Sequence, residues 1–331
     1  MKYLPLFALA GLAISQSLFA QVYSTPVGYH SHTLVQGFNA LGLTLHTPVL
    51  ASGNFETVNG SQLSDTELAF SPVAGRTYIL EINLAGNSSL VGTIQEIAAA
   101  SISGTTITTP DNLGSLGLAA GDTYSLRLAP TFEEVFTTVP RSSGGVLDAA
   151  LSAGSADIIW IPNGSGGYDQ YYLRSGATPE FRNVATNLAS PNIPIVYSDG
   201  FLIQKKNPAS ATLVVQGEIK TKKTNSVAVQ GFNVFSSVLP TGVNLFNAGL
   251  ETNMTAALSE GSADILWVQQ PDLTYVRYFR RSGAGAGWRV AGSSTTLTQA
   301  QAESLSLSSG FLIQRKLSTP INISVNVPAG L

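Results

Sequence analysis

The sequence predicts an all-β protein made of two tandem copies of one β-sandwich-like or barrel-like unit, with a few short helices. Three observations carry this prediction. Short runs of alternating apolar and polar residues are separated by Gly, Ser, Asn and Thr, as in sheets joined by tight turns. Charged residues make up only 11% of the 331 residues, against about 25% in ordinary soluble domains. A long internal repeat divides the chain into two similar parts.

The repeat is clearest where "GSADIIW" begins at Gly154 and "GSADILW" begins at Gly261. From these two glycines, 13 of 29 aligned residues are identical without a gap. Downstream, "GFLIQKK" at 200–206 corresponds to "GFLIQRK" at 310–316. Upstream, "VQGFN" at 35–39 recurs 194 residues later, whereas the central motif recurs after 107 residues. The first copy therefore holds 87 additional residues.

This arithmetic defines the predicted organisation of the chain. The first repeat takes residues 21–49 and 131–222, an insertion takes 50–130, and the second repeat takes 223–331. The insertion contains "ETVNGSQLS" and "ASISGTTIT", which each indicate two short strands joined by an Asn-Gly or Ser-Gly turn. We expect the insertion to form a small β-barrel. Because binding residues often lie in loops carried by a rigid scaffold, the insertion is a reasonable place for specificity.

Residues 1–20 have the features of a secretory signal peptide. Lys2 precedes an apolar run that ends at Ala20, before the polar "QVYST", and this order is typical of export signals. A membrane anchor needs about 20 continuous apolar residues, whereas this run is shorter and is broken at 15–17. We expect export to the extracellular space or the cell surface, with the periplasm as an alternative.

The composition argues against several classes of function. The net charge is −3 and the longest basic stretch is "KTKK" at 220–223, so we expect no nucleic-acid partner. After residues 1–20, no apolar run is long enough for a transmembrane helix. The chain has no cysteine, which excludes disulfides and thiol chemistry. Its low density of charge favours self-association or attachment to a cell-surface or glycan partner.

Several of these segments resemble a family of exported proteins. The segments are "STPVGY", "GFNALGL", "AAGDTYSLR", "SADIIW", "YDQYYLRSG" and "GFLIQKK". They are similar to an uncharacterised family of predicted exported bacterial proteins that share GFN, GD-x-Y, AD, YY and GF-x-I-x-K segments. The resemblance implies secretion. It implies no biochemical activity and transfers no functional residue to this chain.

Several chemically distinctive residues are kept in both repeats. The segment "SADIIWI" is apolar on both faces, which is typical of a central buried strand, so we expect its Trp to lie in the core. Its Asp is expected to cap a turn or to form a charge-assisted bridge beside the repeated arginines. These candidate structural residues are Asp157, Trp160, Arg182, Asp264, Trp267 and Arg289.

The segment "YDQYYLR" gives the candidate binding face. Alternation along a strand places two aromatic rings and one arginine on the same side in each repeat. Such a surface suits stacking on a sugar ring, with the guanidinium donating hydrogen bonds to hydroxyls. The alternative is a buried aromatic pair past which the arginine reaches solvent. The candidate residues are Tyr168, Tyr172, Arg174, Tyr275, Phe279 and Arg281.

The three histidines, His30, His32 and His46, all lie in the first repeat. If "QGFN" turns the chain, they share one face of a hairpin and form a weak candidate site for Zn²⁺ or Cu²⁺. The second repeat has Thr, Ser and Pro at the corresponding positions, so the fold does not require these imidazoles. No acid or cysteine completes a known metal motif. We therefore expect no metal and no cofactor.

The sequence contains no G-x-S-x-G motif, no P-loop and no cysteine nucleophile. Asp157 and Asp264 occupy equivalent positions in separate units, so they need not converge as a pair of catalytic acids. We predict an exported, non-catalytic structural or adhesive protein. The alternative is a glycan-binding protein that uses the aromatic faces of the two repeats, and the third hypothesis is a secreted hydrolase. Recognition is expected where the two copies differ.

Overall fold

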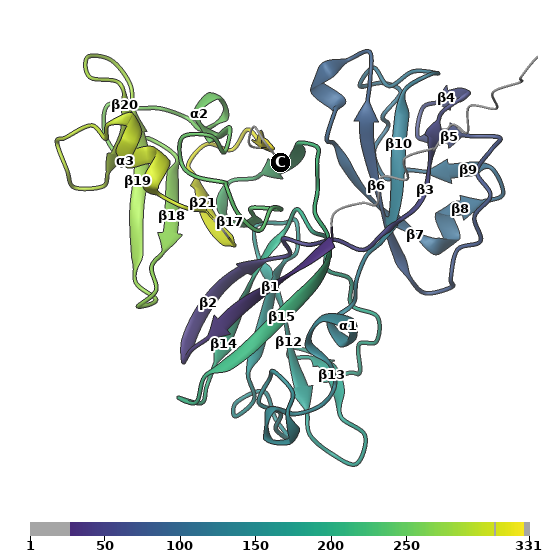
Figure 1. Ribbon diagram of the computed structural model, residues 1–331, viewed down its shortest axis with the longest axis horizontal. Coiled ribbons are helices and arrows are strands. Elements are labelled where there is room, and N and C mark those ends of the chain that lie inside the picture. The colour runs from purple at the N-terminus through teal and green to yellow at the C-terminus, as the bar shows by residue number, and fades with distance from the viewer. Residues whose placement is uncertain (1–26, 308, 328–331) are drawn as a thin grey trace, which may run out of the picture.

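The computed structural model describes residues 27–307 and 309–327 (Figure 1). The predicted signal peptide at 1–20 and the start of the first repeat at 21–26 lie outside these described residues. Strands take 43% of the chain and helices 8%, which confirms the all-β class with few short helices. Figure 1 shows three parts, namely the insertion, the first repeat and the second repeat.

The first repeat is built on a five-stranded antiparallel sheet in the order β13-β12-β11-β14-β2. A two-stranded antiparallel ribbon, β1-β15, completes the unit. The strand that carries the repeated Trp and directly follows the repeated Asp lies in the middle of the sheet. The bounds are β1 (Val27–Leu34), β2 (Gly37–Gly42), β11 (Ile158–Pro162), β12 (Tyr168–Arg174), β13 (Glu180–Asn183), β14 (Gly200–Lys205) and β15 (Ala211–Glu218).

The second repeat has the same topology. Its five-stranded sheet runs β20-β19-β18-β21-β17, and its ribbon is β16-β22. Each strand corresponds, position by position, to one strand of the first repeat, so the duplicated sequence encodes a duplicated unit. The bounds are β16 (Thr224–Ala228), β17 (Gly231–Ser236), β18 (Ile265–Gln269), β19 (Tyr275–Arg281), β20 (Gly287–Val290), β21 (Gly310–Arg315) and β22 (Ile321–Val325).

The insertion forms two four-stranded sheets around a hydrophobic cluster of its own. The short strands pair through the Asn59-Gly60 and Ser103-Gly104 turns. The chain passes from one sheet to the other at residues 55–56 and through η2 (Ala99–Ser101), so the edge strands of one sheet continue into those of the other. The small barrel stays a prediction. One sheet, β3-β10-β6-β7, contains β3 (Val49–Asn54), β6 (Thr77–Leu84), β7 (Ile94–Ala98) and β10 (Thr123–Leu128). The other, β4-β5-β9-β8, contains β4 (Thr57–Asn59), β5 (Gln62–Ser64), β8 (Ile102–Ser103) and β9 (Thr106–Thr108).

The helices are short, and a side-chain cap begins three of them, η1 (Ser88–Leu90), α1 (Phe132–Phe136) and α3 (Gln299–Ser304). Thr131 and Glu134 form a capping box at one of them, and Thr298 and Gln301 form another, which satisfies backbone N–H groups that the helix leaves free. None of the helices in the described residues is long and apolar enough to cross a membrane. The other helices are α2 (Leu250–Asn253), η2 (Ala99–Ser101) and η3 (Arg141–Ser143).

The two repeats pack on each other through equivalent glycines. A Cβ atom on Gly200 would lie 2.7 Å from the carbonyl oxygen of Phe235, and one on Gly310 would lie 2.6 Å from the backbone nitrogen of Leu41. Leu41 and Phe235 occupy equivalent positions in β2 and β17. The same close approach is therefore made twice, as in a two-fold symmetric dimer. One hydrophobic cluster continues through both repeats.

Alanine at either of these glycines should destabilise the protein. Gly200→Ala and Gly310→Ala each place a methyl group inside backbone contact distance of the other repeat, so we expect each to lower the free energy of unfolding by about 1–3 kcal/mol. Urea denaturation followed by circular dichroism measures this change. Gly28→Ala is the matched control, because Gly28 lies in a strand with nothing within 4 Å of the added Cβ. Equal stability of all three variants would contradict the packing argument.

Candidate functional site

The repeated aspartates form buried ion pairs. Asp157 is fully buried and accepts hydrogen bonds from Lys205 Nζ and from the backbone nitrogens of Asp148 and Lys206, each at 2.8 Å. A buried carboxylate needs such partners, because desolvation of an isolated charge is costly. The cation comes from β14.

Asp264 repeats this arrangement with arginine as the cation. It accepts hydrogen bonds from Arg315 Nη1 at 2.7 Å and from the backbone nitrogens of Thr255 at 2.8 Å and Lys316 at 2.9 Å. Each aspartate is thus engaged within its own repeat, and the two do not form one acidic pair. Hydrolysis by Asp157 and Asp264 together has no support in this geometry.

The repeated arginines lie elsewhere and do not bind these aspartates. Arg182 pairs with Glu180 and donates to the carbonyl oxygen of Asn187. Arg289 donates from Nε to Thr296 Oγ1 at 3.1 Å. Our expectation of a charge-assisted bridge beside the repeated arginines therefore named the wrong cations. The sequence signal was present in "GFLIQKK" and "GFLIQRK", where Lys205 and Arg315 occupy equivalent positions.

The two ion pairs differ in their surroundings, and this predicts unequal effects of mutation. Asp264 is the only carboxylate within 4.0 Å of Arg315 among the described residues, whereas Lys205 also lies 3.2 Å from Asp148. We expect Asp264→Asn to cost about 3–5 kcal/mol, because it leaves a buried charge unpaired, and Asp157→Asn to cost less. Chemical denaturation measures both.

The double variant Asp264→Asn with Arg315→Met provides the control for this prediction. It removes both charges and keeps one amide oxygen that accepts a backbone hydrogen bond, so it should recover part of the lost stability. A double variant less stable than Asp264→Asn alone would contradict the assignment of Arg315 as the cation that Asp264 neutralises.

The candidate glycan-binding face is not a continuous exposed surface. Tyr172 is 2% exposed and Phe279 is 5% exposed, so neither ring is accessible to a sugar. The Tyr172 hydroxyl donates to Asn187 Oδ1 at 2.6 Å, within the protein. The two arginines, Arg174 and Arg281, are half-buried at the ends of their strands. The inner half of the predicted face is therefore part of the packing of each repeat, as in the buried alternative.

The remaining rings of the predicted face, Tyr168 and Tyr275, lie at the junction of the repeats, each beside one of the repeated tryptophans. The Trp160 ring packs between Phe38 and Tyr168, with centroid distances of 5.8 and 6.3 Å. Phe232, Trp267 and Tyr275 repeat this cluster at 5.6 and 6.3 Å. Both tryptophans are half-buried rather than enclosed in the core.

Tyr168 and Tyr275 lie close to each other across the junction. The Tyr168 hydroxyl donates to the carbonyl oxygen of Phe232 at 3.4 Å. Burial raises the pKa of Tyr275 to about 12, and the charge of an ionised Tyr168 adds to the shift. These aromatic residues therefore help join the two repeats.

The three histidines, which were a weak candidate for a metal site, do not form a cluster of three. No group of three or more His, Asp or Glu side chains in the described part of the chain is arranged to hold a metal ion. The rings of His30 and His32 lie with their centroids 4.2 Å apart and their planes tilted by 55°, and His30 Nδ1 forms a hydrogen bond with Thr44 Oγ1 at 2.8 Å. His46 follows β2 instead of lying on it, and its Nε2 donates to the carbonyl oxygen of Val238 at 2.8 Å.

The buried histidines should make the protein sensitive to acid. Burial lowers the pKa of His32 to about 4 and that of His46 to about 3, against about 6.5 in an unfolded chain. Below pH 6.5 the unfolded chain therefore binds protons that the folded chain does not. As the pH falls from 6 toward 4, we expect each histidine to lower the free energy of unfolding by about 1.4 kcal/mol per pH unit.

Denaturation at several pH values tests this linkage. His46→Gln keeps a donor for Val238 but does not titrate, so the difference in stability between the variant and the unmodified protein should change with the stated slope. Contributions from the carboxylates are the same in both proteins and cancel. A difference independent of pH would contradict the assignment.

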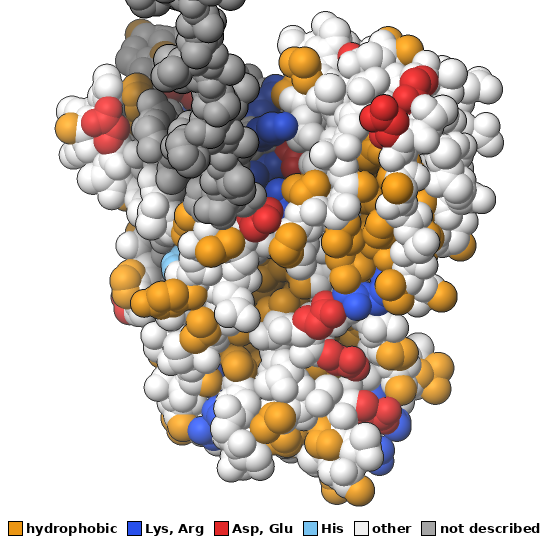
Figure 2. All heavy atoms as spheres, turned by 45° about the vertical axis from the view of Figure 1, so that its right-hand side comes forward, with side chains coloured by type: hydrophobic (Ala, Val, Ile, Leu, Met, Phe, Trp, Pro, Cys, Tyr) orange, Lys and Arg blue, Asp and Glu red, His pale blue; other side chains and the backbone are white. Residues whose placement is uncertain are grey.

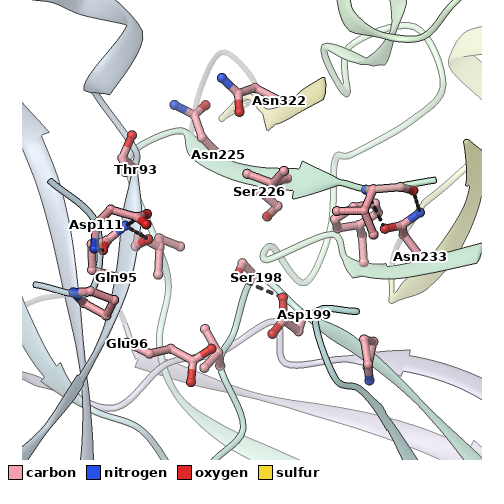
Figure 3. Close-up of a pocket in the computed structure, with 18 of the residues that line it drawn as sticks. Thr93, Gln95, Glu96, Asp111, Ser198, Asp199, Asn225, Ser226, Asn233 and Asn322 are labelled. Atoms are coloured by element: carbon pink, nitrogen blue, oxygen red, sulfur yellow. Dashed lines mark hydrogen bonds between the residues drawn. The ribbon is translucent and has the colours of Figure 1, made fainter. Parts of the chain in front are cut away.

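A cavity of about 750 Å³ lies where the insertion and both repeats meet (Figure 3). It is bounded by β7, by the loop 163–167 between β11 and β12, by the segment before β14 and by the edges of β16 and β17. On the face drawn in Figure 2, hydrophobic side chains gather along the boundary between the insertion and the repeats, together with acidic side chains that have Lys or Arg side chains beside several of them. Polar residues in the lining include Thr93, Gln95, Glu96, Asp111, Asn163, Ser198, Asp199, Asn225, Ser226, Asn233 and Asn322.

Several polar side chains hold the walls of the cavity. Gln95 Nε2 donates to Asp111 Oδ2 at 2.8 Å, and the Asp111 backbone nitrogen donates to Gln95 Oε1 at 3.2 Å. On another wall, Asn233 donates to the Val229 carbonyl oxygen at 2.7 Å. Because these amides and this carboxylate form hydrogen bonds within the protein, they fix the shape of the cavity walls.

Other polar groups point into the open space. Glu96 is an exposed residue of β7, and Asp199 comes from the segment before β14 (Figure 3). Asp199 Oδ1 accepts one hydrogen bond, from Ser198 Oγ at 3.4 Å. Burial raises the pKa of Asp199 to about 7, and the negative charge of Glu96 adds to the shift. Asn322 is exposed at the far side of the cavity.

Sequence reasoning did not identify the residues of this cavity, but one signal was available. Asp199 precedes the shared "GF-x-I-x-K" segment, and the corresponding residue of the second repeat is Ser309. Glu96 lies in the insertion, which the second repeat lacks. Both acids therefore lie where the copies differ.

No family model, curated protein or solved structure matches this chain. The resemblance to a family of exported bacterial proteins stays a prediction.

Proposed function

We infer that this is an exported, non-catalytic adhesive protein that binds a glycan in the cavity between the insertion and the two repeats. The observation that carries this proposal is the convergence of polar side chains from all three parts of the chain on one cavity. Its volume of about 750 Å³ falls within the range of about 300–1,000 Å³ typical of small-molecule sites.

The chemistry of the lining suits a ligand rich in hydroxyl groups. Amide and carboxylate side chains such as Asn322 and Glu96 can accept hydrogen bonds from hydroxyls, and the amide can also donate. Phe232, which is 40% exposed, offers an apolar ring surface in the same cavity. Hydrogen-bonding groups beside a ring face are the combination expected of a site for sugars.

This site differs from the one predicted from the aromatic strands. There, the repeated rings were the binding groups, whereas here the polar groups Glu96 and Asn322 lie in the insertion and at a position that differs between the repeats, and only Phe232 comes from a repeated motif. Duplicated sheets provide a rigid support, and loops on such a support are where recognition commonly lies.

Glycan-array binding by residues 21–331 tests the proposal. Binding to at least one class of glycan is expected, and Asn322→Ala should weaken it by about tenfold, which corresponds to one lost hydrogen bond to the ligand. Asn54→Ala is the matched control, because Asn54 is exposed on β3 and does not line the cavity. An array without a bound glycan, or equal effects of the two variants, would contradict the proposal, and cleavage of a bound glycan would contradict its non-catalytic part.

A further inference from the structure

We propose that the cavity selects glycans that carry a positive charge, such as an unacetylated amino sugar. This inference rests on the proposed function and specifies the ligand of the same site. It follows from the signs of the charged groups around the cavity and from a second, smaller cavity that joins it.

The charged side chains in the lining have one sign. Glu96, Asp111 and Asp199 line the main cavity, and its described lining contains no Lys, Arg or His. Lys223 lies beside the rim, where its Nζ donates to the carbonyl oxygen of Ser88 at 3.4 Å. A concave site lined by charges of one sign concentrates ligands of the opposite charge.

A smaller cavity of about 170 Å³ shares Glu96 and Asp199 with the main one. Asp169 of β12 adds a third carboxylate, and the described lining again holds no basic side chain. Much of the remaining lining is apolar, with Tyr171 and Phe201 among its rings. Burial raises the pKa of Tyr171, and the negative charge of Asp169 adds to the shift.

The two shared acids therefore stand where the cavities meet. Figure 3 shows Glu96 and Asp199 pointing toward the same part of the main cavity, from the insertion and from the first repeat. A cationic group placed between them would neutralise two like charges that otherwise repel. Neutral hydroxyls of the same ligand would face the amides of the main cavity.

Two oligosaccharides of equal length test this inference. One is made of N,N,N-trimethylated glucosamine and the other of N-acetylglucosamine, so they differ mainly in a charge that does not titrate. Calorimetry with residues 21–331 at pH 8 and low salt should give an affinity about tenfold higher for the quaternary compound, as expected for unit charges a few ångströms apart in a partly solvated site. The difference should shrink at 0.5 M salt because of screening.

The pH dependence provides a second readout. Protonation of Asp199 below about pH 7 removes one negative charge, so the preference for the quaternary compound should decrease between pH 8 and pH 5. Asp199→Asn should reduce this pH dependence, and Glu96, whose pKa burial also raises, accounts for the remainder. Glu96→Gln should lower the preference itself without affecting folding. Glu67→Gln is the matched control, because Glu67 is exposed on the insertion outside both cavities.

The outcomes separate the two proposals. Preference for the quaternary compound that Glu96→Gln reduces and Glu67→Gln leaves unchanged would support cationic selectivity. Equal affinity for the two compounds would overturn the selectivity and leave glycan binding in place. Binding of neither compound, with an empty glycan array, would overturn both.

Discussion

The close approach of the two sheets at Gly200 and Gly310 is the constraint on which the rest of the structure depends. Each glycine lets the backbone of the other repeat come within about 3 Å of the space a side chain would occupy. This approach joins two cores into one hydrophobic cluster. It also brings the loop 163–167 of the first repeat beside β17 of the second, and these segments form two walls of the cavity.

Charge is used in two separate ways in this protein. Asp157 and Asp264 are each neutralised inside one repeat by a cation and two backbone amides, so they stabilise the local fold of that repeat. Glu96 and Asp199 have no basic partner in the lining of the cavities. A carboxylate that is paired with a cation inside the protein stabilises the fold, whereas a carboxylate that faces an open cavity without a cationic partner can interact with a ligand.

Much of the scaffold was predictable because its signals are local or repeated. Alternation and turn dipeptides identified strands and hairpins, and the spacing of repeated motifs located the insertion between β2 and β11, two strands of one sheet. The partners of Asp157 and the burial of Tyr172 were not predictable in this way. Strand alternation states which side chains share a face, but only the packing of neighbouring segments decides whether that face is covered.

The sequence by itself determined the all-β class and the duplicated units, since both are recorded in residue patterns that do not depend on how the parts assemble. Only the tertiary structure decided where the cavity lies and which residues line it. The cavity joins Glu96, Asp199 and Asn322, which are separated by about a hundred residues each. Their proximity results from the packing of the insertion and two repeats, and no local pattern specifies packing over that distance.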